Sequence, residues 1–191
     1  MMNNTLLFRL ICLIVIVCCI SAVIPVYGQN SSYFMHVKGQ KSGDILGGVT
    51  QKGKEGQIKV FGYSHEITSP RDPSSGLPTG KRQHKPFVIK KEIDKATPLL
   101  YKALVSNENL TEVTLFFWGS SVGPTGTGAE VLYYTVKLTN ANISSYKSYS
   151  NPHLNSAGMD SMEELAFTYQ KIEWTFKEGG ITAYDDWEAR Q

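Results

Sequence analysis

Only one stretch of the sequence, residues 85–107, carries a convincing helix signal, and the rest alternates as β-sheet sequences do. Within this stretch, Phe87–Ile89 is typical of a short strand. Thr97 and Pro98 then suit a helix start, because threonine caps helices and proline fits the first helical position. Apolar residues follow at three-and-four spacing, and this predicted face consists of Leu99, Leu100, Ala103 and Leu104. A helix of about three turns is marginal alone, so we expect it to brace a sheet.

The remaining segments predict a single, mainly β domain over residues 29–191. The runs 57–67, 111–118, 129–139, 143–149 and 162–176 are typical of strands, because most of them alternate or are rich in aromatic and β-branched residues. Glycine-rich or polar stretches separate them, and residues 177–191 form a polar tail. With about seven or eight strands and one short helix, we expect a sandwich or barrel closed by antiparallel hairpins.

Residues 1–28 differ in character from the rest of the chain. An unbroken apolar run over residues 10–20 follows Arg9 and leads to small residues before Gln29, which is typical of a secretory signal peptide. The longer stretch 6–24, broken only by Arg9 and Ser21, approaches the roughly 20 residues of a spanning helix, so an uncleaved membrane anchor is the alternative. All three cysteines lie within this run, and cleavage would therefore leave a chain with no disulfide and no thiol nucleophile.

A long polar segment, residues 68–84, separates two predicted strands. It holds three prolines and two glycines, and Leu77 is its one apolar residue. Loops of this length in a compact domain are either disordered or functional, so we predict an extended interaction arm. Its candidate contact residues, with the residue that follows the arm, are Arg71, Asp72, Lys81, Arg82, His84 and Lys85.

Charge gives no support for a nucleic-acid or membrane partner. The formal net charge of +2 creates no strong field. The basic residues of the arm lack interleaved aromatic side chains, which supply the stacking half of a single-strand binding platform. We therefore predict no nucleic-acid partner. In the glycine-broken connection at residues 43–56, we expect Lys52, Lys54 and Glu55 to be solvated.

One catalytic motif is present in the sequence. Residues 119–123 spell the glycine-flanked serine of a nucleophile elbow around Ser121, and Glu130 and His153 follow in the order of a triad. The elbow requires a helix directly after the serine, but residues 124–128 contain a proline and two glycines and precede a strand. This context favours a plain hairpin loop. We therefore predict that the chain is not an enzyme and has no catalytic residue.

Neither a metal nor another cofactor is indicated. The four histidines lie far apart, without the paired spacing of metal ligands. Residues 76–82 resemble the sequence motif of a phosphate-binding loop, but the glycine spacing is one residue short and Arg82 replaces the magnesium-binding hydroxyl.

The alternative function is a secreted β-sandwich hydrolase that uses Ser121, or a carbohydrate-binding module that uses exposed aromatics such as Trp118 and Trp187.

Several segments carry a resemblance to a known family. They are residues 33–35, the turn at 52–58, the long loop leading to 85–87, and the distinctive stretch Asp94–Leu100, while Tyr169 and Ile172 match a pattern in the penultimate strand. In this order they resemble the haemolysin-coregulated protein (Hcp) family, the tube subunit of bacterial type VI secretion. The resemblance extends from about Tyr33 to the region of Trp187.

The resemblance implies a fold and a function. The implied fold is a two-sheet antiparallel β-barrel with one short α-helix docked on its side. Six copies would close head to tail into a ring, rings would stack into a hollow tube, and the lumen would carry or chaperone effectors. The 68–84 arm would reach the neighbouring ring. Implied partners are further copies of the chain, the spike protein at the tube tip, the contractile sheath and the effectors.

The leader over residues 1–28 departs from the family pattern, because family members generally lack a signal peptide and are exported from the cytoplasm by the contractile machine. The sequence predicts a protein that is secreted after signal cleavage. The alternatives are a cytoplasmic tube pool exported by type VI secretion, a membrane-anchored form, and a mis-assigned start with Met35 as the true first residue.

Overall fold

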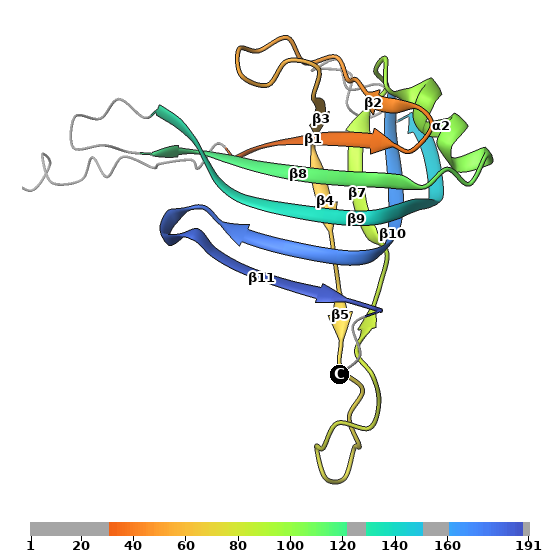
Figure 1. Cartoon of the computed structure of the whole chain (residues 1–191), viewed down its shortest axis with the longest axis vertical. Helices are drawn as coiled ribbons and strands as arrows, with labels where there is room; N and C mark the ends of the chain where they lie inside the picture. Colours follow the sequence, from red (N-terminus) through yellow and green to blue (C-terminus); the bar gives the residue numbers. More distant parts are fainter. Residues whose placement is uncertain (1–30, 122–128, 151–160, 189–191) are drawn as a thin grey trace, which may run out of the picture.

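The computed structural model describes residues 31–121, 129–150 and 161–188, which form antiparallel strands and one α-helix (Figure 1). The predicted leader lies outside these ranges. The strands are β1 (Ser32–Gly39), β2 (Gly43–Ile45), β3 (Ile58–Val60), β4 (Gly62–Ser64), β5 (Ile67–Thr68), β6 (Gln83–His84), β7 (Phe87–Glu92), β8 (Leu110–Ser121), β9 (Ala129–Ser150), β10 (Ser161–Phe176) and β11 (Ile181–Asp186). The helix is α2 (Thr97–Val105), and a 3-10 turn, η1 (Glu178–Gly180), precedes β11. Within the described ranges, no helix has the length and apolar character needed to span a membrane.

Most of the strands form one large sheet. Its order is β2-β1-β8-β9-β10-β7-β4, with β3 also on β1 and β11 also on β10. Neighbouring strands pair antiparallel, as the hairpin prediction requires. The apolar segment 111–118 belongs to β8, which lies between β1 and β9. The two remaining strands, β5 and β6, form a separate ribbon within the predicted arm.

The predicted two-sheet barrel is confirmed in its coarser features, namely a mainly β antiparallel fold with one helix. The strands, however, pair as one main sheet, whose order runs from β2 to β4, and as a small ribbon. The reason is that β9 and β10 are 22 and 16 residues long and bend along their course (Figure 1). Register shifts between Phe117 and Trp118 and between Ala166 and Phe167 mark bulges at which strands bend. Long bent strands therefore continue through regions that were predicted to form two separate sheets.

Two segments differ from their predicted structure. The predicted strands 129–139 and 143–149 are one strand, β9, which continues through Asn140 at a φ of 50°. Residues 177–191 are predicted as a polar tail, but β11 lies within them and pairs with β10. The prediction was wrong there because the first four side chains of β11 are exposed, so the strand lacks the alternation that a half-buried strand shows.

The core is one cluster of apolar side chains, most of them from the strands and a few from α2. Inward-facing residues at alternate strand positions build it, such as Met35 and Val37 in β1 and Ile89 in β7, each with 0% of its surface exposed. Leu100 and Ala103 of α2 belong to the same cluster. The helix therefore packs on the sheet through these two residues.

The start and the apolar face of α2 differ in detail from the prediction. Ala96 is the N-cap residue and makes no side-chain capping hydrogen bond, and Pro98 is the second helical residue. The side chain of Thr97 is engaged elsewhere, as described below. Leu99 is 37% exposed, because each residue turns the helix by about 100° and places it to the side of the buried Leu100. Leu104 packs against the core while partly buried.

Candidate functional site

The predicted arm projects from the sheet as a hairpin between β4 and β7 (Figure 1). β5 and β6 form its base, where Ile67 pairs with His84. Most residues between 69 and 81 are exposed, and Leu77 shows 65% of its surface. The outer part of the arm is therefore a mainly polar surface with one prominent apolar side chain.

The outer part of the arm is ordered by its own hydrogen bonds. The Asp72 carboxylate accepts from the backbone N–H and hydroxyl groups of Ser74 and Ser75 at 2.6 to 3.1 Å. These bonds favour the charged form and lower the pKa of Asp72 to about 2. The turn passes through Gly76 at a φ of 71°, which glycine adopts without strain. Arg71 Nη1 donates to the Gly76 carbonyl at 3.1 Å, which further fixes the turn.

The base of the arm is fastened to the sheet by a polar cluster. Arg82 forms a two-pronged ion pair with Asp185 of β11. His84 Nε2 lies 2.8 Å from the same carboxylate, and His84 Nδ1 lies 2.8 Å from the Tyr169 hydroxyl of β10. His65, in the connection after β4, places its Nε2 2.7 Å from that hydroxyl. The cluster therefore links both ends of the arm to two strands of the main sheet.

Burial and charge shift the pKa values in this cluster. Hydrogen bonds from Arg82 hold the pKa of Asp185 below its ordinary value, although partial burial opposes this. Burial, together with the charge of Asp185, raises the pKa of Tyr169. Burial lowers the pKa of His65, and the neighbouring His84 adds to that effect. The cluster therefore favours a neutral tyrosine, a charged aspartate and a neutral His65.

The predicted contact residues of the arm divide into two groups. The outer group is Arg71, Asp72 and Lys81. The group at or beside the base is Arg82, His84 and Lys85. In the second group, Arg82 and His84 both bind Asp185 of the main sheet, and Lys85 forms an exposed ion pair with Glu66 at 3.7 Å. The outer group, together with Leu77, is therefore the better candidate for contact with another protein.

The first three residues of the nucleophile motif belong to β8, and Val122 and Gly123, with the rest of the predicted hairpin loop, lie outside the described residues. Ser121 is the last residue of β8 and pairs with Ala129 of β9. His153, the third residue of the triad order, lies outside the described residues. Among the described residues, no group of three or more His, Cys, Asp and Glu side chains is placed to hold a metal ion.

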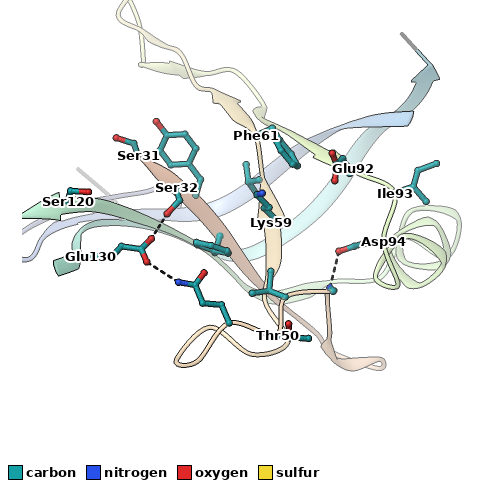
Figure 2. Close-up of a pocket in the computed structure, with 16 residues that line it drawn as sticks. Ser31, Ser32, Thr50, Lys59, Phe61, Glu92, Ile93, Asp94, Ser120 and Glu130 are labelled. Carbon is teal, nitrogen blue, oxygen red and sulfur yellow. Dashed lines mark hydrogen bonds between the residues drawn. The ribbon is translucent and has the colours of Figure 1, made fainter. Parts of the chain in front are cut away.

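Glu130 lies in the wall of a groove of about 850 Å³ that passes over the start of β1, β3 and residues 92–94 (Figure 2). Its carboxylate accepts from Ser32 Oγ at 2.6 Å and from Gln51 Nε2 at 3.0 Å, and pairs with Lys54 Nζ at 2.6 Å. The hydrogen bond from Lys54 and the others hold the pKa of Glu130 below its ordinary value. Because these contacts occupy the carboxylate, it is poorly suited to act as a general base.

Trp118 and Trp187, the two aromatic residues proposed for carbohydrate binding, lie in different environments. Trp118 of β8 is half-buried, and Lys54 Nζ lies 4.2 Å from its ring centroid and 4.4 Å from that of Phe34. Lys54 was predicted to be solvated, but it is 3% exposed because these rings and Glu130 surround it. Trp187 is 46% exposed and packs on His84 at the base of the arm. The two tryptophans therefore do not form one stacking platform.

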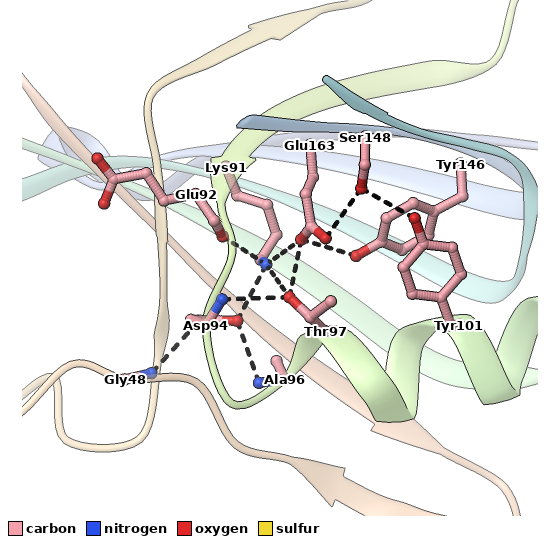
Figure 3. A network of polar contacts seen from close by, with 10 residues as sticks. All are labelled: Gly48, Lys91, Glu92, Asp94, Ala96, Thr97, Tyr101, Tyr146, Ser148 and Glu163. Atoms are coloured by element: carbon pink, nitrogen blue, oxygen red, sulfur yellow. Dashed lines mark hydrogen bonds and ion pairs between the residues drawn. The ribbon is translucent and has the colours of Figure 1, made fainter. Parts of the chain in front are cut away.

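A buried charge network that was not predicted from the sequence lies at the start of α2 (Figure 3). Lys91 Nζ and Glu163 Oε2 lie 2.6 Å apart, and neither side chain is exposed. Lys91 also pairs with Asp94 at 2.9 Å. Thr97 Oγ1 accepts from Lys91 at 3.0 Å and donates to Glu163 at 2.8 Å. The predicted capping residue thus connects the start of the helix to the sheet.

Two tyrosines complete this network. The Tyr146 hydroxyl donates to Glu163 at 2.8 Å, and burial together with this hydrogen bond raises the pKa of Tyr146. The rings of Tyr101 and Tyr146 stack with centroids 3.9 Å apart, and the Tyr101 hydroxyl lies 2.9 Å from Ser148 Oγ. Helix, β9 and β10 are therefore joined by one set of polar contacts.

The alternation of β7 contains the signal that would have revealed this network. Lys91 continues the buried series of Phe87 and Ile89, and Glu163 precedes the buried Leu165 in β10. A charge at an inward position of a strand requires a buried partner. The two residues stand directly opposite each other in the β7–β10 ladder.

The comparisons with known proteins agree with this architecture. Residues 34–176 match the family described as "Type VI secretion system effector, Hcp". The "Major exported protein" of Pseudomonas aeruginosa is 40% identical over 167 residues, which are 82% of this chain and 95% of the relative. A solved variant of Hcp1 from E. coli is 31% identical, with a TM-score of 0.71 over 82% of this chain and 98% of that chain. The secreted protein Hcp3 from Pseudomonas aeruginosa is 33% identical, with a TM-score of 0.67 over 83% and 99% of the two chains. The chain belongs to the Hcp family of type VI secretion tube proteins.

Proposed function

We propose that this chain is a structural subunit of the inner tube, and that six copies close head to tail into rings that stack and carry or chaperone effectors. The observation that carries the proposal is the arm over residues 68–84. Its tip is ordered by the Asp72 turn, its base is held by Arg82 and His84, and its outer surface is exposed. A preformed, exposed hairpin loses little conformational entropy when it meets a neighbouring ring.

The strand pairing supports a subunit with free edges for ring closure. Residues 58–64 pair with β1 through β3 and with β7 through β4. We infer that this segment closes the main sheet into a barrel, with β2 and β11 left as outer edges. Ile181 and Tyr184 of β11 are 67% and 64% exposed. An exposed edge with apolar side chains favours contact with a second copy, and a ring follows if that head-to-tail contact closes.

The other partners follow from membership of the family. We expect the spike protein at the tip of the tube, the contractile sheath around it and secreted effectors within its lumen. The subunit acts through shape and assembly rather than through chemistry on a substrate. This agrees with the Glu130 carboxylate, which is already bound by Ser32, Gln51 and Lys54.

We further propose that the protein acts after export, since the Pseudomonas aeruginosa relative is named a major exported protein. The leader over residues 1–28 would be removed as a signal peptide. Retention of the leader would instead anchor the chain, and a cytoplasmic pool exported by type VI secretion would need no leader. The first residue of the protein, read by mass spectrometry, distinguishes these routes: Gln29 indicates cleavage and Met1 indicates retention.

Light scattering of the purified protein, with negative-stain images of the same fraction, tests the assembly. We expect rings of six subunits and, at higher concentration, short stacks of rings. A monomer that persists at high concentration would contradict ring assembly as an intrinsic property of the chain.

A change confined to the outer arm separates stacking from ring closure. In the double variant Leu77→Asp with Lys81→Glu, we expect single rings to persist and stacks to be lost, because both side chains are exposed and neither belongs to the base cluster. The control is Lys52→Glu, which reverses an exposed charge in the turn before β3 and should leave the stacks intact. Normal stacks in the double variant would contradict the proposed role of the arm.

A further inference from the structure

Two imidazoles at the base of the arm share one hydroxyl group. His65 Nε2 lies 2.7 Å and His84 Nδ1 lies 2.8 Å from the Tyr169 hydroxyl oxygen, and the two imidazole centroids are 6.1 Å apart. The other nitrogen of His84 lies 2.8 Å from the Asp185 carboxylate. The four groups therefore form one continuous chain of hydrogen bonds, which crosses the base of the arm.

The chain of hydrogen bonds is complete when both histidines are neutral. The charged Asp185 can only accept, so His84 Nε2 carries the hydrogen, and the Nδ1 of neutral His84 is then an acceptor. Tyr169 donates its O–H to that Nδ1. The tyrosine oxygen in turn accepts the Nε2–H of His65. Every contact then joins one donor to one acceptor.

A first added proton leaves the chain of hydrogen bonds unbroken. When His84 is protonated, its Nδ1–H donates to the Tyr169 oxygen, and the tyrosine O–H turns to His65 Nε2. His65 remains neutral and carries its hydrogen on Nδ1 instead. A second proton makes a complete set of hydrogen bonds impossible. Both imidazoles then donate to the Tyr169 oxygen, and the tyrosine hydrogen has neither imidazole nitrogen left as an acceptor.

The surrounding groups do not offset a second positive charge. Asp185 is already shared by Arg82 and His84, and the Asp186 carbonyl accepts from Arg82 at 3.1 Å. The exposed pair formed by Lys85 and Glu66 contributes little, since solvent screens it. The other neighbours of the two imidazoles are the rings of Phe87, Trp174 and Trp187, with Glu188 in the adjoining pocket.

We propose that His65, Tyr169 and His84 form a proton-sensitive latch, which holds the base of the arm on the sheet while at most one imidazole is protonated and releases it when both are. The latch is a property of a single chain. Its consequence, that acid would loosen the contact between rings, rests on the proposed function of the arm.

The direction of the pH dependence follows from His65. Burial and His84 lower its pKa in the folded protein, so the folded state binds the second proton less readily than an open arm does. The stabilisation that the latch gives to the base of the arm is therefore complete above the ordinary histidine pKa of about 6.5. This stabilisation is lost as the pH falls from that value through the lowered pKa of His65.

Hydrogen exchange of the full chain, read in peptides that cover β5 and β6, tests the latch at about pH 7.5 and about pH 5, on either side of the ordinary histidine pKa. His65→Gln keeps an N–H that reaches the Tyr169 hydroxyl but cannot be protonated. At the lower pH we expect the wild type to lose protection in this ribbon and the variant to keep it, because only the wild type can take up the second proton. Comparison at the same pH cancels the intrinsic pH dependence of exchange.

His36→Gln is the matched control, because His36 pairs with Asp44 at 3.3 Å in β1 and β2 and should leave the wild-type behaviour unchanged. Equal loss of protection in His65→Gln, or full protection of the wild type at the lower pH, would overturn the latch. The imidazole titrations of the wild type, followed by NMR, give a second test that needs no variant. Protection must fall where the second of His65 and His84 is protonated, and a fall where neither titrates also overturns the proposal.

This experiment separates the latch from the proposed assembly. Exchange in β5 and β6 reports the base of the arm in one chain, whereas light scattering reports rings and stacks. Acid-sensitive exchange in a protein that forms no rings would support the latch and contradict the assembly. Rings whose arm base is insensitive to acid would do the reverse.

Discussion

Lys91 and Glu163 are opposite charges with no exposed side-chain surface, and they face each other across β7 and β10. A buried ion pair adds little net stability, because desolvation costs about as much as the attraction returns. Removal of one partner is different, since it leaves the other charge buried and less well compensated. We therefore interpret the pair as a device that fixes the register of the two strands and, through Thr97, the start of α2.

In the variant Glu163→Gln, we expect the free energy of unfolding to fall by about 3 kcal/mol, because Lys91 stays buried and keeps Asp94 as its remaining carboxylate partner. Chemical denaturation at neutral pH measures the change. The control is Glu164→Gln, which breaks the adjacent exposed pair with Lys90 at 3.6 Å and should cost less than about 1 kcal/mol. Similar losses in both variants would contradict the role given to the buried pair.

At the level of elements, α2 is held by one face. Leu100 and Ala103 are buried in the core, whereas Leu99 is 37% exposed although it continues the apolar spacing of the sequence. The spacing identifies the helix, but the sheet decides which side of a broad apolar surface is covered. Tyr101 lies on the other flank, where it stacks on Tyr146 of β9.

Truncation of the two neighbouring leucines measures this difference. We expect Leu100→Ala to lower the free energy of unfolding by about 2 to 4 kcal/mol, because it leaves a cavity between helix and sheet. Leu99→Ala should cost less than about 1 kcal/mol, since much of that side chain already meets water. Thermal or denaturant unfolding of both variants gives the comparison, and equal costs would show that the burial of α2 is misassigned.

The elements that sequence reasoning predicted are those with a local signal. The helix follows from the spacing after Pro98, and the arm follows from the proline- and glycine-rich composition of residues 68–84. The cluster that holds the arm has no such signal, because Tyr169 follows His65 by 104 residues and Asp185 follows His84 by 101 residues along the chain. Only the pairing of β10 with β11 brings Tyr169 and Asp185 to one place, and β11 itself was missed.

At the level of the whole molecule, the resemblance to the Hcp family anticipated more than periodicity did. Strand alternation led to a β domain with hairpins, and it could not determine the path by which the sheet bends. That path depends on bulges such as the one between Ala166 and Phe167, and on residues 58–64, which pair with both β1 and β7. Both features involve long-range pairing that a short sequence window does not contain.

The strand order also has a consequence for the time course of folding. β8, β9, β10 and β11 follow one another in the chain and pair with their sequence neighbours, whereas Met35 of β1 pairs with Leu115 of β8. Closing the long intervening segment costs more conformational entropy than closing a hairpin, so we expect the C-terminal meander to form first and β1 to dock late. Pulse-labelled exchange during refolding would contradict this order if β1 gained protection before β9. Until β1 docks, one edge of β8 stays unpaired, and the duration of that interval sets how long an incomplete subunit is open to wrong strand pairing.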